Sequence, residues 1–258
     1  DSNARFSASE QLAELEVLKK YADSRVIKQK QFHYLHDAVF MMGSINAKRG
    51  NRERGLELMI SSASIGKSLL TSKVVKEANQ IAELAVDLGR FDVAAQFYGE
   101  AAHSAKHVPD FSEDQQLGLR EQQAYALHEA GQYEKALTIN REVLAGGERL
   151  HGPESPVLRV VLTNIAQNLH ALGRLSEIGP FLQRALASAR AGDDFYAEQD
   201  LLFQLGVLTF EVGKPDGARN YMAERIALVK QRGDDSLLKS AEEDLEILTK
   251  KIREESSK

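Results

Sequence analysis

The sequence predicts an all-α protein, a solenoid of stacked helix-turn-helix pairs, and three observations support this fold class. Glycines recur at spacings of 39, 42, 42 and 40 residues, at Gly50, Gly89, Gly131, Gly173 and Gly213. A small residue lies seven positions before each of these glycines, and in four of the five cases Gly or Ala also lies five positions after it. Apolar residues follow helical spacing along most of the chain, whereas hardly any segment has the pattern of a strand. Self-similarity with a period of about 20 to 50 residues is typical of solenoids.

The turn glycines and the small residues around them have a common physical explanation. A glycine can end a helix in the left-handed conformation without a clash of its side chain. Two antiparallel helices joined by such a turn approach closely only where the facing residues are small. A single pair cannot bury its apolar faces alone, so neighbouring pairs must stack.

The first element expected is a flanking helix over residues 8–28, in a single domain that covers residues 5–256. Ser7 and Glu10 fit a capping box, and apolar residues follow at helical spacing at Leu12, Leu15, Leu18 and Ala22. Residues 1–4 resemble the remnant of an expression tag, so native N-terminal sequence is expected to be missing.

Five helix pairs follow, and a capping helix ends the domain. The repeats are expected at about 32–70, 72–107, 114–150, 156–192 and 196–232. The prolines agree with this division: Pro215 starts a helix, and Pro180, next to Gly179, is expected to kink or delay one. The helix over 235–254 has one apolar and one charged face, as a cap at the end of a solenoid requires.

Composition narrows the possible functions. The 258 residues carry a formal charge of −5, which argues against a phosphate-binding basic face and hence against nucleic acid. The absence of cysteine excludes disulfides, thiolate metal sites and a cysteine nucleophile. No apolar run reaches the roughly 20 residues that span a bilayer, so no membrane contact is expected and the cytoplasm is the favoured location.

The repeat pattern resembles that of tetratricopeptide repeats. The small residues, the turn glycine, an apolar residue two positions after it and the following Ala are clearest in 80–101, 122–143 and 164–185. The 42-residue period and the 150–156 loop are similar to the longer repeats of the kinesin light chain type. The resemblance covers about 32–226, with departures at Arg52 and Pro215. It implies a right-handed superhelix whose concave groove is lined by the first helix of each pair.

Two short motifs suggest chemistry, and in both cases a solvated helix end is the favoured interpretation. Gly66, Lys67 and Ser68 match the end of a phosphate-binding loop, but the earlier glycine and the preceding strand of that motif are missing. Glu100, His103 and His107 have a spacing that could hold a divalent ion. His33 and His36 are expected only to pack or to face water. We therefore expect no enzyme activity, no cofactor and no metal.

The groove that the resemblance implies supplies the candidate binding residues. They are the polar and aromatic residues on the first helices: Asn79, Gln80, Glu83, Glu121, Gln122, Tyr125, His128, Asn164, Gln167, His170, Phe203, Gln204 and Phe210. Side-chain amides can bind the backbone of a peptide, and the aromatic rings can anchor apolar side chains. These positions hold no Lys or Arg, which favours a neutral or basic partner. In the alternative interpretation the amides are merely solvated, and Phe203 and Phe210 pack against the C-terminal helix.

Three functions are compatible with this sequence. The favoured one is a non-catalytic scaffold that binds a protein or peptide in its groove. The second is a ligand- or peptide-sensing module of a longer regulator or transcription activator. The third, least favoured, is an enzyme that would use the Glu100 trio or Lys67. The oligomeric state is not specified by the pattern.

Overall fold

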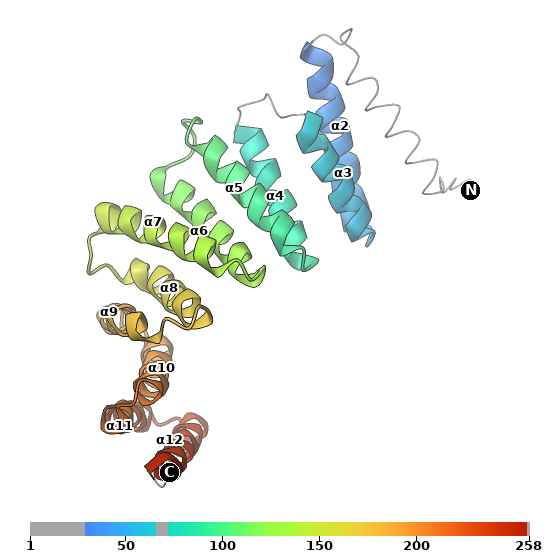
Figure 1. The fold of residues 1–258 in the computed structure, drawn as a ribbon. Helices are drawn as coiled ribbons and strands as arrows, with labels where there is room; N and C mark the ends of the chain where they lie inside the picture. The colour runs from blue at the N-terminus through green and yellow to red at the C-terminus, as the bar shows by residue number, and fades with distance from the viewer. Residues whose placement is uncertain (1–28, 66–71, 257–258) are drawn as a thin grey trace. The chain divides into compact units, whose positions relative to one another are not determined.

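The computed structural model describes residues 29–65 and 72–256, so the predicted flanking helix over 8–28 lies outside the described residues. Contacts divide the chain into two compact units, one that ends at Ser112 and one that begins at Glu113. The described residues contain helices and no strand, which confirms the all-α prediction (Figure 1). The single domain expected over 5–256 stays a prediction.

The first unit contains two helix pairs. They are formed by α2 (Gln29–Lys48) with α3 (Arg52–Ile65) and by α4 (Ser72–Asp87) with α5 (Phe91–Ala105). The second helix of the first pair, α3, packs against α4. The predicted division into repeats at 32–70 and 72–107 stays a prediction.

The second unit contains three further pairs and a final helix. The pairs are α6 (Glu113–Glu129) with α7 (Tyr133–His151), α8 (Arg159–Ala171) with α9 (Ile178–Ala191), and α10 (Phe195–Glu211) with α11 (Pro215–Arg232). Short 3-10 turns precede α8 and α9, at Pro156–Leu158 and Leu175–Glu177. The last helix, α12 (Asp235–Ser256), packs against α11.

All five predicted turn glycines have the left-handed conformation, with φ between 68° and 91°. At Gly89, the Arg90 N–H donates to the Ala85 carbonyl at 2.8 Å, and the Gly89 N–H donates to the Val86 carbonyl at 2.9 Å. The same two hydrogen bonds recur at each of the other four turns. This is the Schellman motif, which satisfies carbonyls that a helix leaves free at its C-terminus.

Small residues bring the two helices of each pair together, as the sequence predicts. Ala82, Ala124 and Ala136 are each fully buried. In the first pair a Cβ on Gly43 would lie 2.8 Å from the Gly55 carbonyl oxygen, so these two backbones touch. Close packing of this kind excludes larger side chains at these positions.

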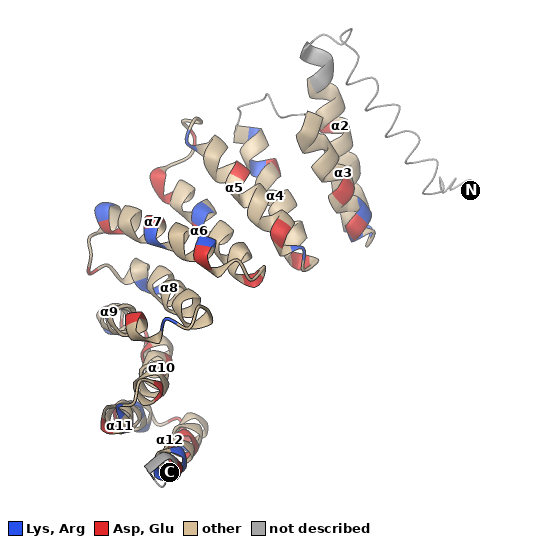
Figure 2. Ribbon diagram, viewed as in Figure 1, with Lys and Arg blue, Asp and Glu red and all other residues tan. Residues whose placement is uncertain are grey.

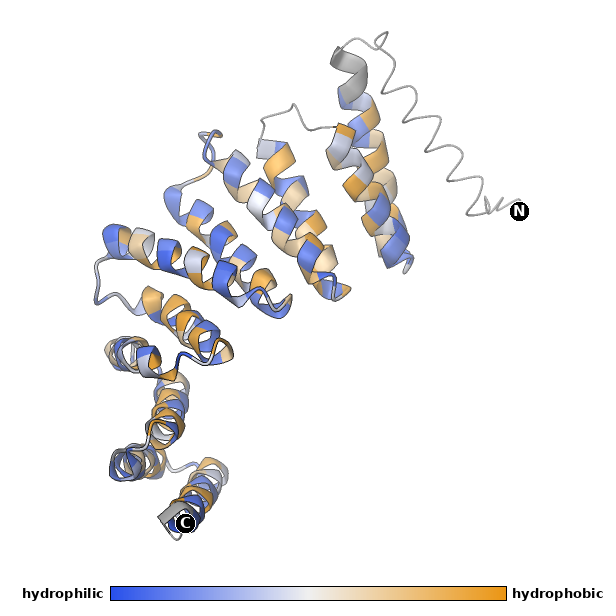
Figure 3. Cartoon of the chain, in the orientation of Figure 1, coloured by the Kyte–Doolittle hydropathy of each residue, from blue (hydrophilic) through white to orange (hydrophobic). Residues whose placement is uncertain are grey.

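The final helix covers the end of the last pair. Leu248 and Ile252 of α12 form a buried cluster with Ala218 and Met222 of α11, and Phe203, Val207, Phe210 and Leu245 pack against it. Figure 3 shows apolar and polar residues in alternation along the helices, as expected where one face of each is buried. α12 therefore has the contacts expected of the predicted capping helix.

Exposed ion pairs join the second helices of consecutive repeats within each unit. Arg90, which directly precedes α5, lies 3.3 Å from Glu53 of α3, and Arg184 of α9 lies 2.5 Å from Glu148 of α7. Arg190 of α9 also pairs with Glu224 of α11. Charged residues of both signs occur along most of the helices (Figure 2). Because such exposed pairs each contribute about 0–1 kcal/mol, the apolar contacts dominate the stacking.

Candidate functional site

The first helices of the second unit enclose a hollow of about 380 Å³. α6, α8 and α10 supply its walls, whereas Ile178 and Leu182 of α9 form part of its apolar lining. Five of the predicted groove residues line it: His128, Gln167, His170, Phe203 and Gln204. Residues from three successive repeats thus meet at one site, although up to 76 positions separate them in the sequence. We call this site the inner hollow.

The polar groups of the inner hollow are held by hydrogen bonds within and between repeats. Nδ1 of His128 donates to Oδ1 of Asn168 at 3.0 Å, and Asn168 in turn donates to the Asn164 carbonyl at 2.7 Å. The imidazole of His128 also meets the Tyr133 ring edge-on, with 5.1 Å between centroids. These contacts fix the orientation of the His128 ring in the hollow.

The rim of the inner hollow is polar and carries one carboxylate. Nε2 of His170 lies 3.7 Å from Oε2 of Glu211, and the amide of Gln204 donates to Asp200 at 2.9 Å. Gln167 is exposed beside them on α8. The hollow is lined by no Lys or Arg of the described chain. An apolar floor with amides, imidazoles and a carboxylate around it suits a neutral or basic ligand.

Phe203 and Phe210 have the contacts expected if both rings pack against the C-terminal helix, which is the alternative interpretation of these residues. Both pack against the cluster that α12 completes. The guanidinium of Arg225 lies 5.0 Å from the centre of the Phe203 ring and pairs with Asp244 of α12 at 2.6 Å. Phe203 also lines the inner hollow, so this ring connects the cap to the candidate site.

The other predicted groove residues lie outside the inner hollow. On α4, Asn79 donates to Glu83 at 2.7 Å, while Gln80 is exposed. On α6, Gln122 and Tyr125 are exposed and Glu121 is half-buried. Burial raises the pKa of the Glu121 carboxyl. Of the predicted amide row formed by Gln80, Gln122, Asn164 and Gln204, only Gln204 lines the hollow.

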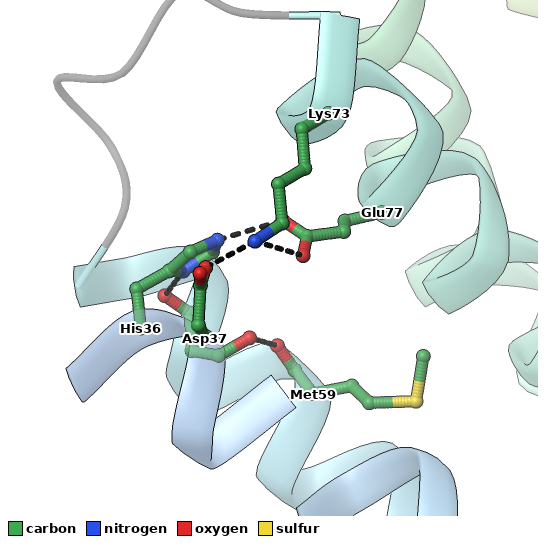
Figure 4. A network of polar contacts seen from close by, with 6 residues as sticks. His36, Asp37, Met59, Lys73 and Glu77 are labelled. Carbon is green, nitrogen blue, oxygen red and sulfur yellow. Dashed lines mark hydrogen bonds and ion pairs between the residues drawn. The ribbon is translucent and has the colours of Figure 1, made fainter. Parts of the chain in front are cut away.

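Sequence reasoning missed a buried polar network in the first unit (Figure 4). His36 is 2% exposed; its Nε2 lies 2.7 Å from Oε2 of Glu77 and its Nδ1 lies 2.8 Å from the Ser62 carbonyl. Nζ of Lys73 lies 2.5 Å from Asp37 and 4.0 Å from Glu77. The hydrogen bond with Glu77 is the main cause of the raised pKa of His36. One signal in the sequence could have revealed this network. Glu77 lies at the repeat position where the later repeats have the apolar residues Val161 and Leu201.

This network is better described as a junction between helices than as a metal centre. Among the described residues, His36, Asp37 and Glu77 have ligand atoms close enough together to bind one metal ion. However, the ammonium of Lys73 lies 2.5 Å from Asp37 and 4.0 Å from Glu77, so a cation of the chain itself already lies beside these carboxylates. The network connects α2, α3 and α4, so its contacts hold the first two repeats of this unit together.

The two chemical motifs find no support in the described residues. The imidazoles of His103 and His107 are exposed and meet edge-on, 5.5 Å between centroids, while Glu100 accepts a hydrogen bond from Gln96. Lys67 lies outside the described residues.

Residues 116–191, which form most of the walls of the inner hollow, match the family model of the tetratricopeptide repeat. Over this segment the chain is similar to tetratricopeptide repeats. The resemblance predicted from the turn glycines is thereby confirmed. No curated protein sequence gives a significant match to the chain.

Solved structures of other proteins have a similar fold. One is a kinesin light chain structure of nearly identical repeats from Podosopora anserina, with a TM-score of 0.58 and 14% identity over 76% of this chain and 95% of that one. Another is aspartyl phosphate phosphatase F from Bacillus subtilis, with a TM-score of 0.59 and 15% identity over 96% and 68%. A third is a Rap protein complexed with Competence and Sporulation Factor, with a TM-score of 0.50 and 15% identity over 93% and 69%. At these identities the likeness concerns the fold. No described helix is both long and apolar enough to cross a membrane.

Proposed function

We propose that this protein is a non-catalytic scaffold whose second unit binds a segment of a partner protein or peptide across α6, α8 and α10. The observation that carries this proposal is the inner hollow, where the first helices of three successive repeats meet. Its apolar floor suits a large side chain of the partner, and Gln167 and Gln204 can bind the adjacent backbone.

Charge favours a neutral or basic partner segment. Glu211 is the charged residue in the lining of the inner hollow. Glu121 lies on α6, the helix that also carries His128. Carboxylates at a rim mainly increase the association rate of a basic ligand, and salt weakens this effect. Glu211→Lys should therefore slow the association of a basic peptide at low ionic strength.

The test starts from a library of random nonapeptides displayed on phage. A peptide that binds the full chain is selected from this library and synthesised. Ala171→Phe fills the mouth of the inner hollow from the exposed last residue of α8, so we expect it to weaken the selected peptide at least tenfold. Ala191→Phe adds the same ring to the exposed last residue of α9, outside the hollow, and should change the affinity less than twofold. Equal affinities for both variants would refute the proposal.

A sensing module within a longer regulator is the second candidate. The solved structure of a Rap protein complexed with Competence and Sporulation Factor supports it, because that protein has the same fold. Both candidates share the binding step at the inner hollow. A native reading frame that adds an effector domain to this chain would favour the second.

A further inference from the structure

A second hollow, of about 500 Å³, lies between the first turns of α9 and α11. We call it the outer hollow. Leu205, Leu208 and Val212 of α10 form its apolar floor, and Gly179 and Gly217 border it from the two second helices. Its volume is within the range of small-molecule sites in proteins. None of the residues predicted for the groove lines it.

The outer hollow exists because the fourth repeat departs from the repeat pattern. Six residues after the turn glycine, the first three repeats have buried side chains at Leu56, Ala95 and Leu137. The fourth repeat has Gly179, and a Cβ built there would meet no atom within 4 Å. The missing side chain therefore leaves open space where the earlier repeats are filled.

The lining of the outer hollow combines apolar surface with one positive charge. Lys214 is the charged residue among the lining side chains, and no carboxylate of the described residues forms an ion pair with it. Ser176 and Thr209 supply hydroxyl groups. The charge in the inner hollow has the opposite sign, because the charged residue in its lining is Glu211. The two hollows therefore differ in the sign of the charge in their lining, which favours ligands of different charge.

One wall of the outer hollow is closed by a contact between the two second helices. The amide of Gln183 on α9 donates to the hydroxyl of Tyr221 on α11 at 3.5 Å. Together with the floor formed by α10, this contact borders the apolar part of the hollow, while Lys214 is exposed. A ligand that buried its apolar part here would keep its charged end beside the ammonium.

We propose that the outer hollow binds a small apolar carboxylic acid. The apolar part lies against Leu205 and Val212, and the carboxylate pairs with the ammonium of Lys214. An apolar acid matches both parts of this lining, the floor formed by α10 and the single ammonium. This site is separate from the proposed function and does not depend on it.

The experiment is an NMR titration of the full chain with octanoate and with octanamide at millimolar concentrations. We expect octanoate to shift the amide resonances of α9, α10 and α11, and octanamide to bind about threefold to fivefold more weakly because an exposed ion pair is lost. Lys214→Gln should reduce the affinity for octanoate to that for octanamide and leave octanamide unchanged.

The decisive variant fills the space left by the glycine. Gly179→Leu should abolish binding of both probes. Gly118→Leu is the matched control, because a Cβ on this helical glycine of α6 also meets nothing within 4 Å, and it should leave both affinities unchanged. Equal octanoate affinity in the two leucine variants would overturn the proposal. Binding of a peptide with a C-terminal leucine, but not of octanoate, would overturn it in favour of a polypeptide terminus.

Discussion

Met42 and Ile165 occupy the same place in their repeats, eight residues before the turn glycine, yet their environments differ. Met42 on α2 is 42% exposed, whereas Ile165 on α8 is fully buried. Five residues before the turn, Ile45 is likewise 43% exposed while the equivalent Leu208 on α10 is buried. The face of α2 that corresponds to the stacking face of later repeats is thus open in the described structure.

The comparison extends to the chemistry of the stacking face. Twelve residues before the turn, α8 and α10 bury Val161 and Leu201, whereas α4 buries the carboxylate Glu77 beside His36. The position in the repeat therefore predicts which residues face a neighbour. The neighbour decides whether that contact is apolar, ionic or absent, and so how much it stabilises the fold.

We expect the largest effect on stability from a substitution at the buried position, Ile165. Ile165→Ala should destabilise the second unit by about 2–5 kcal/mol, because it removes buried methyl groups and leaves a cavity. Amide hydrogen exchange in α6 to α10 measures this change unit by unit. Val160→Ala on the same helix, where the side chain is 47% exposed, is the control and should cost less than about 0.5 kcal/mol. Similar costs would show that the repeat register is misassigned.

We expect a smaller effect on stability, with a defined dependence on pH, from the contact between His36 and Glu77. The pKa of His36 is raised above its ordinary value of 6.5, mainly by the hydrogen bond to Glu77. The protonated form is thus stabilised by folding: its contribution is complete below pH 6.5 and is lost as the pH rises through the raised pKa. Protection of α2 to α4 should fall over this range in the wild type. In Glu77→Gln this fall should be reduced; an equal fall would mean that another group titrates.

The smallest effect is expected at the open face. Met42→Ala should change the stability of the first unit by less than about 0.5 kcal/mol, as is usual for exposed positions. Gly43→Ala, one residue later, should cost about 1–3 kcal/mol, because its Cβ would lie 2.8 Å from the Gly55 carbonyl. Thermal unfolding followed by circular dichroism compares the two. A large cost for Met42→Ala would mean that a further segment covers this face.

The local part of the fold was predictable from sequence, since it depends on residues close together in the chain. The turn glycines give the helix ends, and Gly179 with Pro180 gives the late start of α9 at Ile178. The His36–Glu77 contact was not predictable, because it joins residues 41 positions apart and depends on how the pairs stack.

The binding sites show the same limit. The repeat register placed His128, Gln167, His170 and Gln204 on one face, because equivalent positions on stacked helices share a face, and these four residues line the inner hollow. It could not show that Gln122 lies outside the hollow or that Phe203 contacts both the hollow and the cap. The outer hollow was missed because a glycine in a sequence indicates a flexible backbone as readily as a missing side chain.

The five turn glycines are required for their handedness and not for their size. A Cβ built on any of them meets no atom within 4 Å, so the turn has room for a side chain. What it disfavours is most L-residues, for which the left-handed conformation is strained. The turn into α10 shows the exception, because Asp193, a residue type that tolerates this conformation, adopts φ of 51° there and closes the same pair of hydrogen bonds. A mirror-image D-alanine would fit all five turns, because the constraint there is on the handedness of the backbone and not on the size of the side chain.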